Sequence, residues 1–337
     1  MKARCLLVSC LALLCLGSLA QANITIDTVP VGDAGNAADT RYETPGYGSV
    51  GYTYNIGKYE VTAGQYTEFL NAKATITPTY GLYNTGFLSD QYGCNIKRSG
   101  SGTQADPYSH SVASDWANRP VNCVSYWDAC RFANWLGNGQ GNGDTENGAY
   151  TLNGYHGDDG RSIQRNAGWK WAVTSEDEWY KAAYYKGGDT NAGYWDYPTK
   201  SDTAPSNVGS DGYTDPGNSA NYNNNGYTIG SLYYRTNVGE FENSASAYGT
   251  FDQGGNVFEW NEAIISDAYR GSRGGSFNLP GDRLQASYRS PYNKSPSYEG
   301  LILGFRVSEV VPEPSSFIAL AGGLGMFLGF RRRVSPK

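Results

Sequence analysis

Three cysteines and two histidines are the side chains between the two ends of the chain that are best suited to chemistry. Cys94, Cys123 and Cys130 could supply thiolates, which act as nucleophiles and as soft ligands for copper(I). His110 and His156 are the only imidazoles, and both lie in polar segments. A three-histidine iron site cannot be built from two histidines, so iron chemistry of that kind is excluded.

Capping signals predict the helices that would position such groups. Each signal is a Ser or Thr at the helix start followed three residues later by a side chain that bonds back to it. Cys130 falls on the apolar face of the second helix, where it is expected to be a small buried group. The three pairs are Thr62 with Gln65, Ser125 with Asp128, and Ser175 with Glu178.

The rest of the chain is rich in residues that form turns. Glycine supplies 44 of 337 residues, against an ordinary share of about 7%. Strands are expected at residues 51–56 and, between glycine turns, from Tyr248 to Val307, whereas residues 73–118 are expected to be mostly loop. The sequence therefore predicts one loop-rich α+β domain with two to three helices and short antiparallel strands.

Six segments occur in an order that resembles the formylglycine-generating enzymes, also called sulfatase-modifying factors. They are GKYEVTAGQYTEFLN (57–71), RPVNCVSYWDACRFANWL (119–136), WAVTSEDEWYKAAYY (171–185), YGTFDQGGNVFEW (248–260), RGSRGGSFN (270–278) and LGFRV (303–307). The resemblance covers about residues 48–307 and implies a fold similar to that of C-type lectins. Residues 23–47 are then a lead-in segment.

The resemblance also implies a bound calcium ion at the segment GGNVFEW. Calcium takes six to eight oxygen ligands, and a glycine-rich turn exposes backbone carbonyls to it. The alternative is that Glu259 pairs or caps structurally. The expected ligands are the backbone of Gly254, Gly255 and Val257 and the side chain of Glu259, with Asn256 nearby and Asn221 next to Tyr222 at a second position.

The catalytic cysteines of the resembled family are replaced here. Those cysteines bind copper and follow the RGGS turn, and the resemblance implies that they fall near Leu279 and Leu284. Leucine cannot ligate copper or form a disulfide, so neither copper nor iron is expected as a cofactor. Ser276 and Asn278 remain as the expected binding-pocket residues, and Arg306 is expected to be a buried structural arginine rather than a substrate ligand.

Residues 1–22 have the features of a secretory signal. Lys2 and Arg4 precede an apolar run of roughly 15 residues, which is short for a membrane span of about 20. The segment Ala20-Gln21-Ala22 forms a small-residue cleavage site. In an exported chain an odd number of cysteines permits one internal disulfide at most. A disulfide involving Cys94 and a set of buried free thiols both remain open.

Residues 308–337 are similar to a PEP-CTERM sorting signal. The tetrapeptide VPEP at 311–314 is followed by an apolar run at 317–330 and by three arginines at 331–333. The apolar run can enter a bilayer, and the arginines would hold the terminus on the cytoplasmic side. The resemblance implies processing by an exosortase-type machinery after transient membrane insertion by residues 317–330.

The charge of the chain excludes nucleic acid as a partner. The formal net charge is −6, and Lys2, Arg4 and the C-terminal arginines belong to the two ends, so the domain between them is more acidic still. A protein that binds phosphate backbones needs a basic surface.

These observations predict an exported protein of the cell surface or extracellular matrix whose domain acts as a non-catalytic binding or structural module. The ligand would bind near Ser276, Asn278 and the loop at 281–299. An extracellular polysaccharide and a surface protein are the two ligand classes left open. The alternative function is a divergent oxidoreductase of the same family that acts on sulfur or uses a non-haem metal, and the inventory of cysteines and histidines argues against it.

Overall fold

The computed structural model describes residues 23–207, 215–266, 268–291 and 294–311. The expected signal at 1–22 and nearly all of the expected sorting signal at 308–337 lie outside the described residues. Within the part of the chain that is described, none of the helices combines the length and hydropathy needed to cross a bilayer.

The main sheet joins the two ends of the domain. Its strand order is β1 (Thr28–Val31), β2 (Tyr54–Gly57), β9 (Val307–Val310) and β5 (Trp171–Val173), and every neighbouring pair is antiparallel. The strand β1 therefore brings the expected lead-in segment into the fold, and β9 extends the fold to Val310, beyond the expected boundary at Val307.

Two smaller sheets complete the strands. In one, β6 (Phe258–Ile265) pairs antiparallel with β7 (Tyr269–Arg273) and parallel with β8 (Leu303–Gly304). The other is a hairpin of β3 (Lys97–Ser99) and β4 (Ser109–Ser111) in the segment expected to be loop. All three residues of β3 are exposed, so no alternation of polar and apolar residues marked that strand in the sequence.

All three predicted helix starts are confirmed. α1 (Ala63–Lys73), α3 (Tyr126–Gly137) and α4 (Glu176–Tyr184) each begin with a complete capping box. A fourth helix, α2 (Ser114–Ala117), is one turn long, and its N-cap makes no side-chain hydrogen bond, so no capping signal announced it. Three short 3₁₀ helices lie at Thr85–Leu88, Gly160–Ser162 and Gly281–Leu284.

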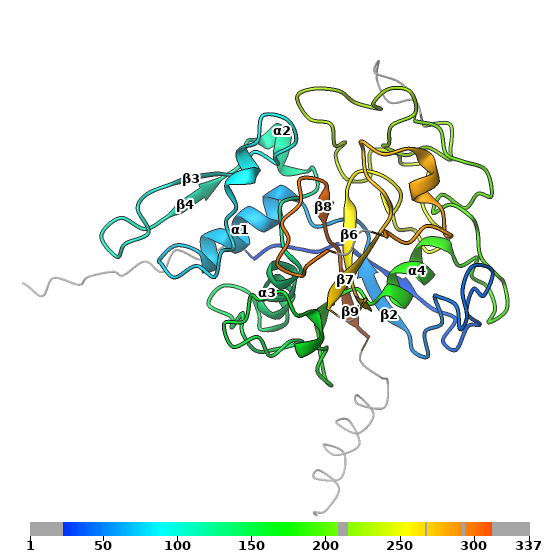
Figure 1. Cartoon of the computed structure of the whole chain (residues 1–337), viewed down its shortest axis with the longest axis horizontal. Helices are drawn as coiled ribbons and strands as arrows, with labels where there is room; N and C mark the ends of the chain where they lie inside the picture. The colour runs from blue at the N-terminus through cyan, green and yellow to red at the C-terminus, as the bar shows by residue number, and fades with distance from the viewer. Residues whose placement is uncertain (1–22, 208–214, 267, 292–293, 312–337) are drawn as a thin grey trace, which may run out of the picture.

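Aromatic side chains fill the core on both sides of the strands. In Figure 1 the labelled strands β2, β6, β7, β8 and β9 lie between α1 and α3 on one side and α4 on the other, whereas the β3–β4 hairpin lies on the outer side of α1. Phe69 of α1 packs against Phe132 and Trp135 of α3 at ring-centroid distances of 5.4 and 5.2 Å. The resulting arrangement is the loop-rich α+β fold that the sequence predicts.

The three cysteines among the described residues all lie in this core. Cys94, Cys123 and Cys130 are free and buried. Burial raises the pKa of each thiol above its usual value. The interpretation of these residues as small buried groups is therefore confirmed, and the disulfide involving Cys94 is not formed.

Candidate functional site

A fully buried ion pair stands at the centre of the expected calcium segment. Arg306 donates from Nε to Oε2 of Glu259 at 2.6 Å and from Nη2 to Oε1 at 2.7 Å, and both side chains have an exposed fraction of 0%. Trp179 of α4 also donates to Oε2, at 2.8 Å. Both carboxylate oxygens of Glu259 thus accept hydrogen bonds. Glu259 therefore pairs structurally, as the alternative to a calcium-binding role had stated.

Arg306 uses its remaining donors on backbone carbonyls. Its Nη1 donates to Gly57 at the end of β2 at 3.0 Å, and its Nη2 donates to Phe251 at 2.9 Å. Burial opposes the charged form of Arg306, but the negative charge of Glu259 and the hydrogen bonds that Arg306 donates to it raise the pKa of Arg306. The expectation of a buried structural arginine is confirmed.

Two further carboxylates lie close to this pair. Glu60 is only 2% exposed, and it accepts long hydrogen bonds from Asn256 Nδ2 at 3.3 Å and Val257 N at 3.4 Å. Burial, then the charges of Asp252 and Glu259, raise the pKa of Glu60 well above its usual value. Burial also raises the pKa of Asp252 to about 6, although a hydrogen bond from Gly239 N at 2.6 Å opposes this.

The sequence did not single out Glu60 or Asp252. Both occur inside the quoted family segments, Glu60 in KYEVT and Asp252 directly before the glycine turn. The sequence did contain one signal, because Glu60 stands between Tyr59 and the apolar Val61. A carboxylate that is buried in such a context needs a partner, so this position could have marked Glu60 as a candidate site residue.

The turn brings the residues expected around calcium together. Asn221 forms a parallel bridge with Gly255, and its Nδ2 donates to Asn256 Oδ1 at 2.7 Å. Its own Oδ1 is buried without a partner among the described residues, and a cation would satisfy such an acceptor. A ligand role for Glu259, in contrast, would place the ion against a carboxylate that already accepts from Arg306 and Trp179.

A calcium ion at this segment would draw its oxygen ligands from Glu60, Asp252, Asn221 and the carbonyls of the turn, while Glu259 is held in its ion pair. Within the described ranges, no group of three or more Asp, Glu, His or Cys side chains is arranged to hold a metal ion. Amide and backbone oxygens would have to complete the coordination, as they commonly do for calcium.

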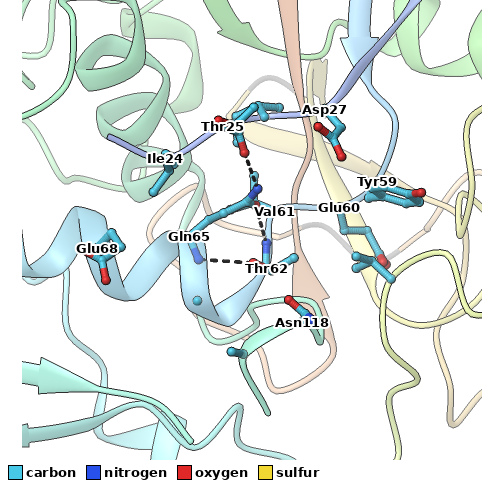
Figure 2. A pocket seen from close by; sticks show the side chains of 14 residues that line it. Ile24, Thr25, Asp27, Tyr59, Glu60, Val61, Thr62, Gln65, Glu68 and Asn118 are labelled. Carbon is cyan, nitrogen blue, oxygen red and sulfur yellow. Dashed lines mark hydrogen bonds between the residues drawn. The ribbon is translucent and has the colours of Figure 1, made fainter. Parts of the chain in front are cut away.

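A cavity of about 500 Å³ gives access to Glu60. Figure 2 shows Asp27, Tyr59 and Glu60 gathered at one end of this cavity and Glu68 at the other. Gln65 closes the wall between them, because it completes the capping box with Thr62 and donates to Thr25 O at 2.9 Å. Among the described residues that line the cavity there is no Lys, Arg or His, so its field favours cations.

The expected binding-pocket residues lie elsewhere, after β7. Ser276 is fully buried, and its hydroxyl donates to Asn278 Oδ1 at 2.8 Å. Leu284 is buried in a cluster with Tyr197, Ala220 and Tyr222, and Leu279 is half-buried against the main core. The positions that hold cysteines in the resembled enzymes are filled here by apolar packing.

An aromatic cluster that the sequence analysis missed lies beside Ser276. Phe277 is buried and contacts Tyr92 and Tyr234 at ring-centroid distances of 5.0 and 5.8 Å. Tyr227 contacts Tyr234 at 5.1 Å, and its hydroxyl lies 3.3 Å from that of Tyr92. We call Tyr92, Tyr227 and Tyr234 the tyrosine surface. Tyr227 is 38% exposed, and Tyr92 and Tyr234 are partly buried, so a ligand would reach this surface at Tyr227.

Comparison with known proteins identifies a family. The model of the sulfatase-modifying factor enzyme 1-like domain matches residues 23–310. A comparison with curated proteins gave no match.

Among solved structures, the chain is similar to CarF with 20% identity and a TM-score of 0.50, over 86% of this chain and 99% of CarF. It is also similar to variable protein 1 of Treponema denticola, with 17% identity, a TM-score of 0.44 and coverage of 84% and 94%. A third similar structure is PvdO from Pseudomonas aeruginosa, with 19% identity and a TM-score of 0.44 over 84% of this chain and 94% of PvdO. The likeness to CarF supports the fold alone.

The buried ion pair yields a first prediction. Arg306→Met should lower the free energy of unfolding by about 3–5 kcal/mol, because it leaves the buried Glu259 carboxylate without its cation. The double variant Arg306→Met with Glu259→Leu should recover part of that loss. Urea unfolding measures both. Arg161→Met, which removes the exposed pair with Asp159, should cost only about 0–1 kcal/mol. Equal losses in the single and double variants would contradict this account.

The pKa of Asp252 yields a second prediction. Folded Asp252 holds its proton up to about pH 6, whereas the unfolded residue releases it near 3.8. In the presence of a chelator, stability should therefore fall as the pH rises through this window. Asp252→Asn should flatten this decline and raise the melting temperature at neutral pH.

Added calcium should make the wild-type protein melt at a higher temperature than Asp252→Asn, because calcium stabilises only the folded state that provides its ligands. The wild-type protein should gain more than Asp252→Asn, while the exposed control Asp282→Asn should behave like wild type. Identical pH profiles for wild type and Asp252→Asn, or no effect of calcium on either, would overturn the assignment.

Proposed function

The chain belongs to the family of sulfatase-modifying factor enzyme 1-like domains, and we propose that it is an exported binding module that has lost the oxidation chemistry of the resembled enzymes. The observation that carries this proposal is the tyrosine surface packed on Phe277, the residue after Ser276, together with apolar packing at Leu279 and Leu284. The chain keeps the fold of the family but has leucines where the resembled enzymes have reactive cysteines.

The thiols that remain do not restore the chemistry. Copper and disulfide chemistry both need an accessible thiolate. Cys94, Cys123 and Cys130 are buried, and burial raises the pKa of each. At neutral pH these thiols stay protonated inside the core, which supports a binding role over catalysis.

An extracellular polysaccharide is the ligand class that the tyrosine surface supports. Tyrosine offers a flat apolar face together with a hydroxyl that can donate and accept, so it suits a ring that carries both C–H faces and hydroxyls. The hydroxyls of Tyr92 and Tyr227 lie close to each other at the exposed rim, while the rings pack on Phe277. A rigid aromatic platform of this kind loses little entropy when a sugar chain binds.

Calcium would have a structural role in this module. Glu60 and Asp252 would hold it with Asn221 and the carbonyls of the turn at 254–257, and its charge would replace the repulsion among the buried carboxylates. The ion would thereby stabilise the turn that leads into β6.

The two ends of the chain would deliver the module to its place of action. In this proposal the signal at 1–22 exports the protein, residues 317–330 enter the membrane transiently, and an exosortase-type machinery processes the tail. The mature domain then stays at the cell surface or in the extracellular matrix.

The ligand proposal is tested with polysaccharide from the producing cells. The purified mature domain should be retained by the immobilised polysaccharide, and Tyr227→Ala should weaken retention roughly tenfold, as expected for loss of an aromatic anchor. The matched control is Tyr42→Ala, which removes an exposed tyrosine outside the tyrosine surface. Retention that is equal for all three proteins would refute the role of this surface.

The loss of catalysis is tested separately. With copper and oxygen, the mature domain should leave a peptide bearing the sulfatase motif Cys-x-Pro-x-Arg unchanged in mass, because no accessible thiolate is present to bind copper. Conversion of the peptide thiol to an aldehyde would show that the proposal is wrong. Single Cys→Ser variants at 94, 123 and 130 would then identify the reactive thiol.

A further inference from the structure

A second cavity, of about 450 Å³, lies at the start of α3. Its lining includes Tyr80, Asn84, Asp128, Arg131 and Glu299. It shares none of these residues with the cavity in Figure 2 or with the tyrosine surface. Its size falls in the range in which protein pockets hold small molecules.

Two carboxyl groups meet in the wall of this cavity. Asp128 accepts from Ser125 N at 2.8 Å as part of the capping box of α3, and it also forms a hydrogen bond with Glu299. Asn84 donates its amide to the other side of Glu299. Burial and the neighbouring Asp128 raise the pKa of Glu299 to about 8. The pair therefore shares one proton at neutral pH.

A buried arginine in the same wall lacks one acceptor. Arg131 has an exposed fraction of 0%, and it binds Glu146 through Nε at 2.7 Å and Nη2 at 3.2 Å. Its Nη2 also donates to Tyr155 O at 2.9 Å. Nη1 has no hydrogen-bond partner among the described residues. Because buried donors are almost always paired, this nitrogen points to an oxygen supplied by a ligand.

Packing and capping do not account for these groups. The capping box accounts for the hydrogen bond to one oxygen of Asp128, and Glu146 accepts the hydrogen bonds from Nε and Nη2 of Arg131. Neither explains why Glu299 forms a second carboxyl contact or why Nη1 of Arg131 is unpaired. The ring of Tyr80, 4.9 Å from the guanidinium and 42% exposed, adds an aromatic face at the opening.

We propose that this cavity binds a neutral saccharide unit, with adjacent ring hydroxyls held between Glu299 and Nη1 of Arg131. One hydroxyl oxygen accepts from Nη1, and its neighbour donates to the carboxyl pair. Tyr80 packs against the C–H face of the ring.

The charges around the cavity select against ionic ligands. The Asp128–Glu299 pair keeps one negative charge, which disfavours an anion, and the unpaired Nη1 of Arg131 needs an acceptor, which a cation does not provide. A hydroxyl can both donate and accept, so it satisfies the two sides of the cavity without adding charge.

The test uses five monosaccharides as probes in saturation-transfer NMR titrations of the mature domain. The neutral probes are glucose, galactose and mannose, and the charged ones are glucuronate and glucosamine. We expect at least one neutral sugar to bind in the millimolar range and the charged sugars to bind more weakly. No binding by any neutral sugar, or tighter binding by a charged one, would overturn the proposal.

Variants locate the binding. Glu299→Gln should retain binding, because its amide can donate to Asp128 as the protonated acid does. Glu299→Leu should weaken it by roughly tenfold or more, and Thr85→Trp, at an exposed residue of the cavity lining, should block it without disturbing the core. The control Glu242→Leu, at an exposed carboxylate, should bind like wild type.

This site shares no residues with the tyrosine surface, so the experiments can reject either binding proposal without the other. Tyr227→Ala should leave monosaccharide binding at the cavity unchanged. If Glu299→Leu and Thr85→Trp both bind as wild type does, the assignment of the cavity is wrong whatever the tyrosine surface binds.

Discussion

The ion pair between Glu259 and Arg306 is the constraint around which the domain is built. Removing both charges from water is costly, and the cost is tolerable only when every donor and oxygen is satisfied. Here Trp179, Gly57 and Phe251 provide the missing partners. The bond from Arg306 to Gly57 joins positions 249 residues apart. In a chain with few regular strands, the single side chain of Arg306 thus connects segments that lie far apart in the sequence.

The same arrangement leaves an excess of negative charge beside it. One guanidinium serves Glu259 fully, whereas Glu60 and Asp252 have only amide donors. Their raised pKa values show that the fold resists their ionisation. Protonation or a bound cation would relieve this strain, and the acidic cavity in Figure 2 leads from the surface to Glu60. The proposed calcium ion would therefore compensate the carboxylates beside the central ion pair.

Local chemistry was predictable from the sequence, and long-range contacts were not. The capping boxes at Thr62, Ser125 and Ser175 depend on residues three apart, so their helix starts could be located exactly. The tyrosine surface depends on Tyr92 and Tyr227, which are 135 residues apart, and no periodicity connects them. Glu299 meets Asp128 in the same way. The family resemblance supplied the fold and suggested Glu259 as a calcium ligand, but it gave no sign that Arg306 would pair with this carboxylate.

The retained RGGS turn has a reason that does not involve catalysis. Gly274 and Gly275 have φ values of 97° and 73°, which non-glycine residues rarely adopt. A Cβ on Gly275 would lie 2.9 Å from Leu284 Cδ1, and one on Gly254 would lie 3.4 Å from Leu284 Cδ2. Leu284 therefore packs into the space that the glycines leave open, at a position where the resembled enzymes have a cysteine. Once leucine occupies that space, packing alone requires the glycine turn, whether or not the turn takes part in any chemistry.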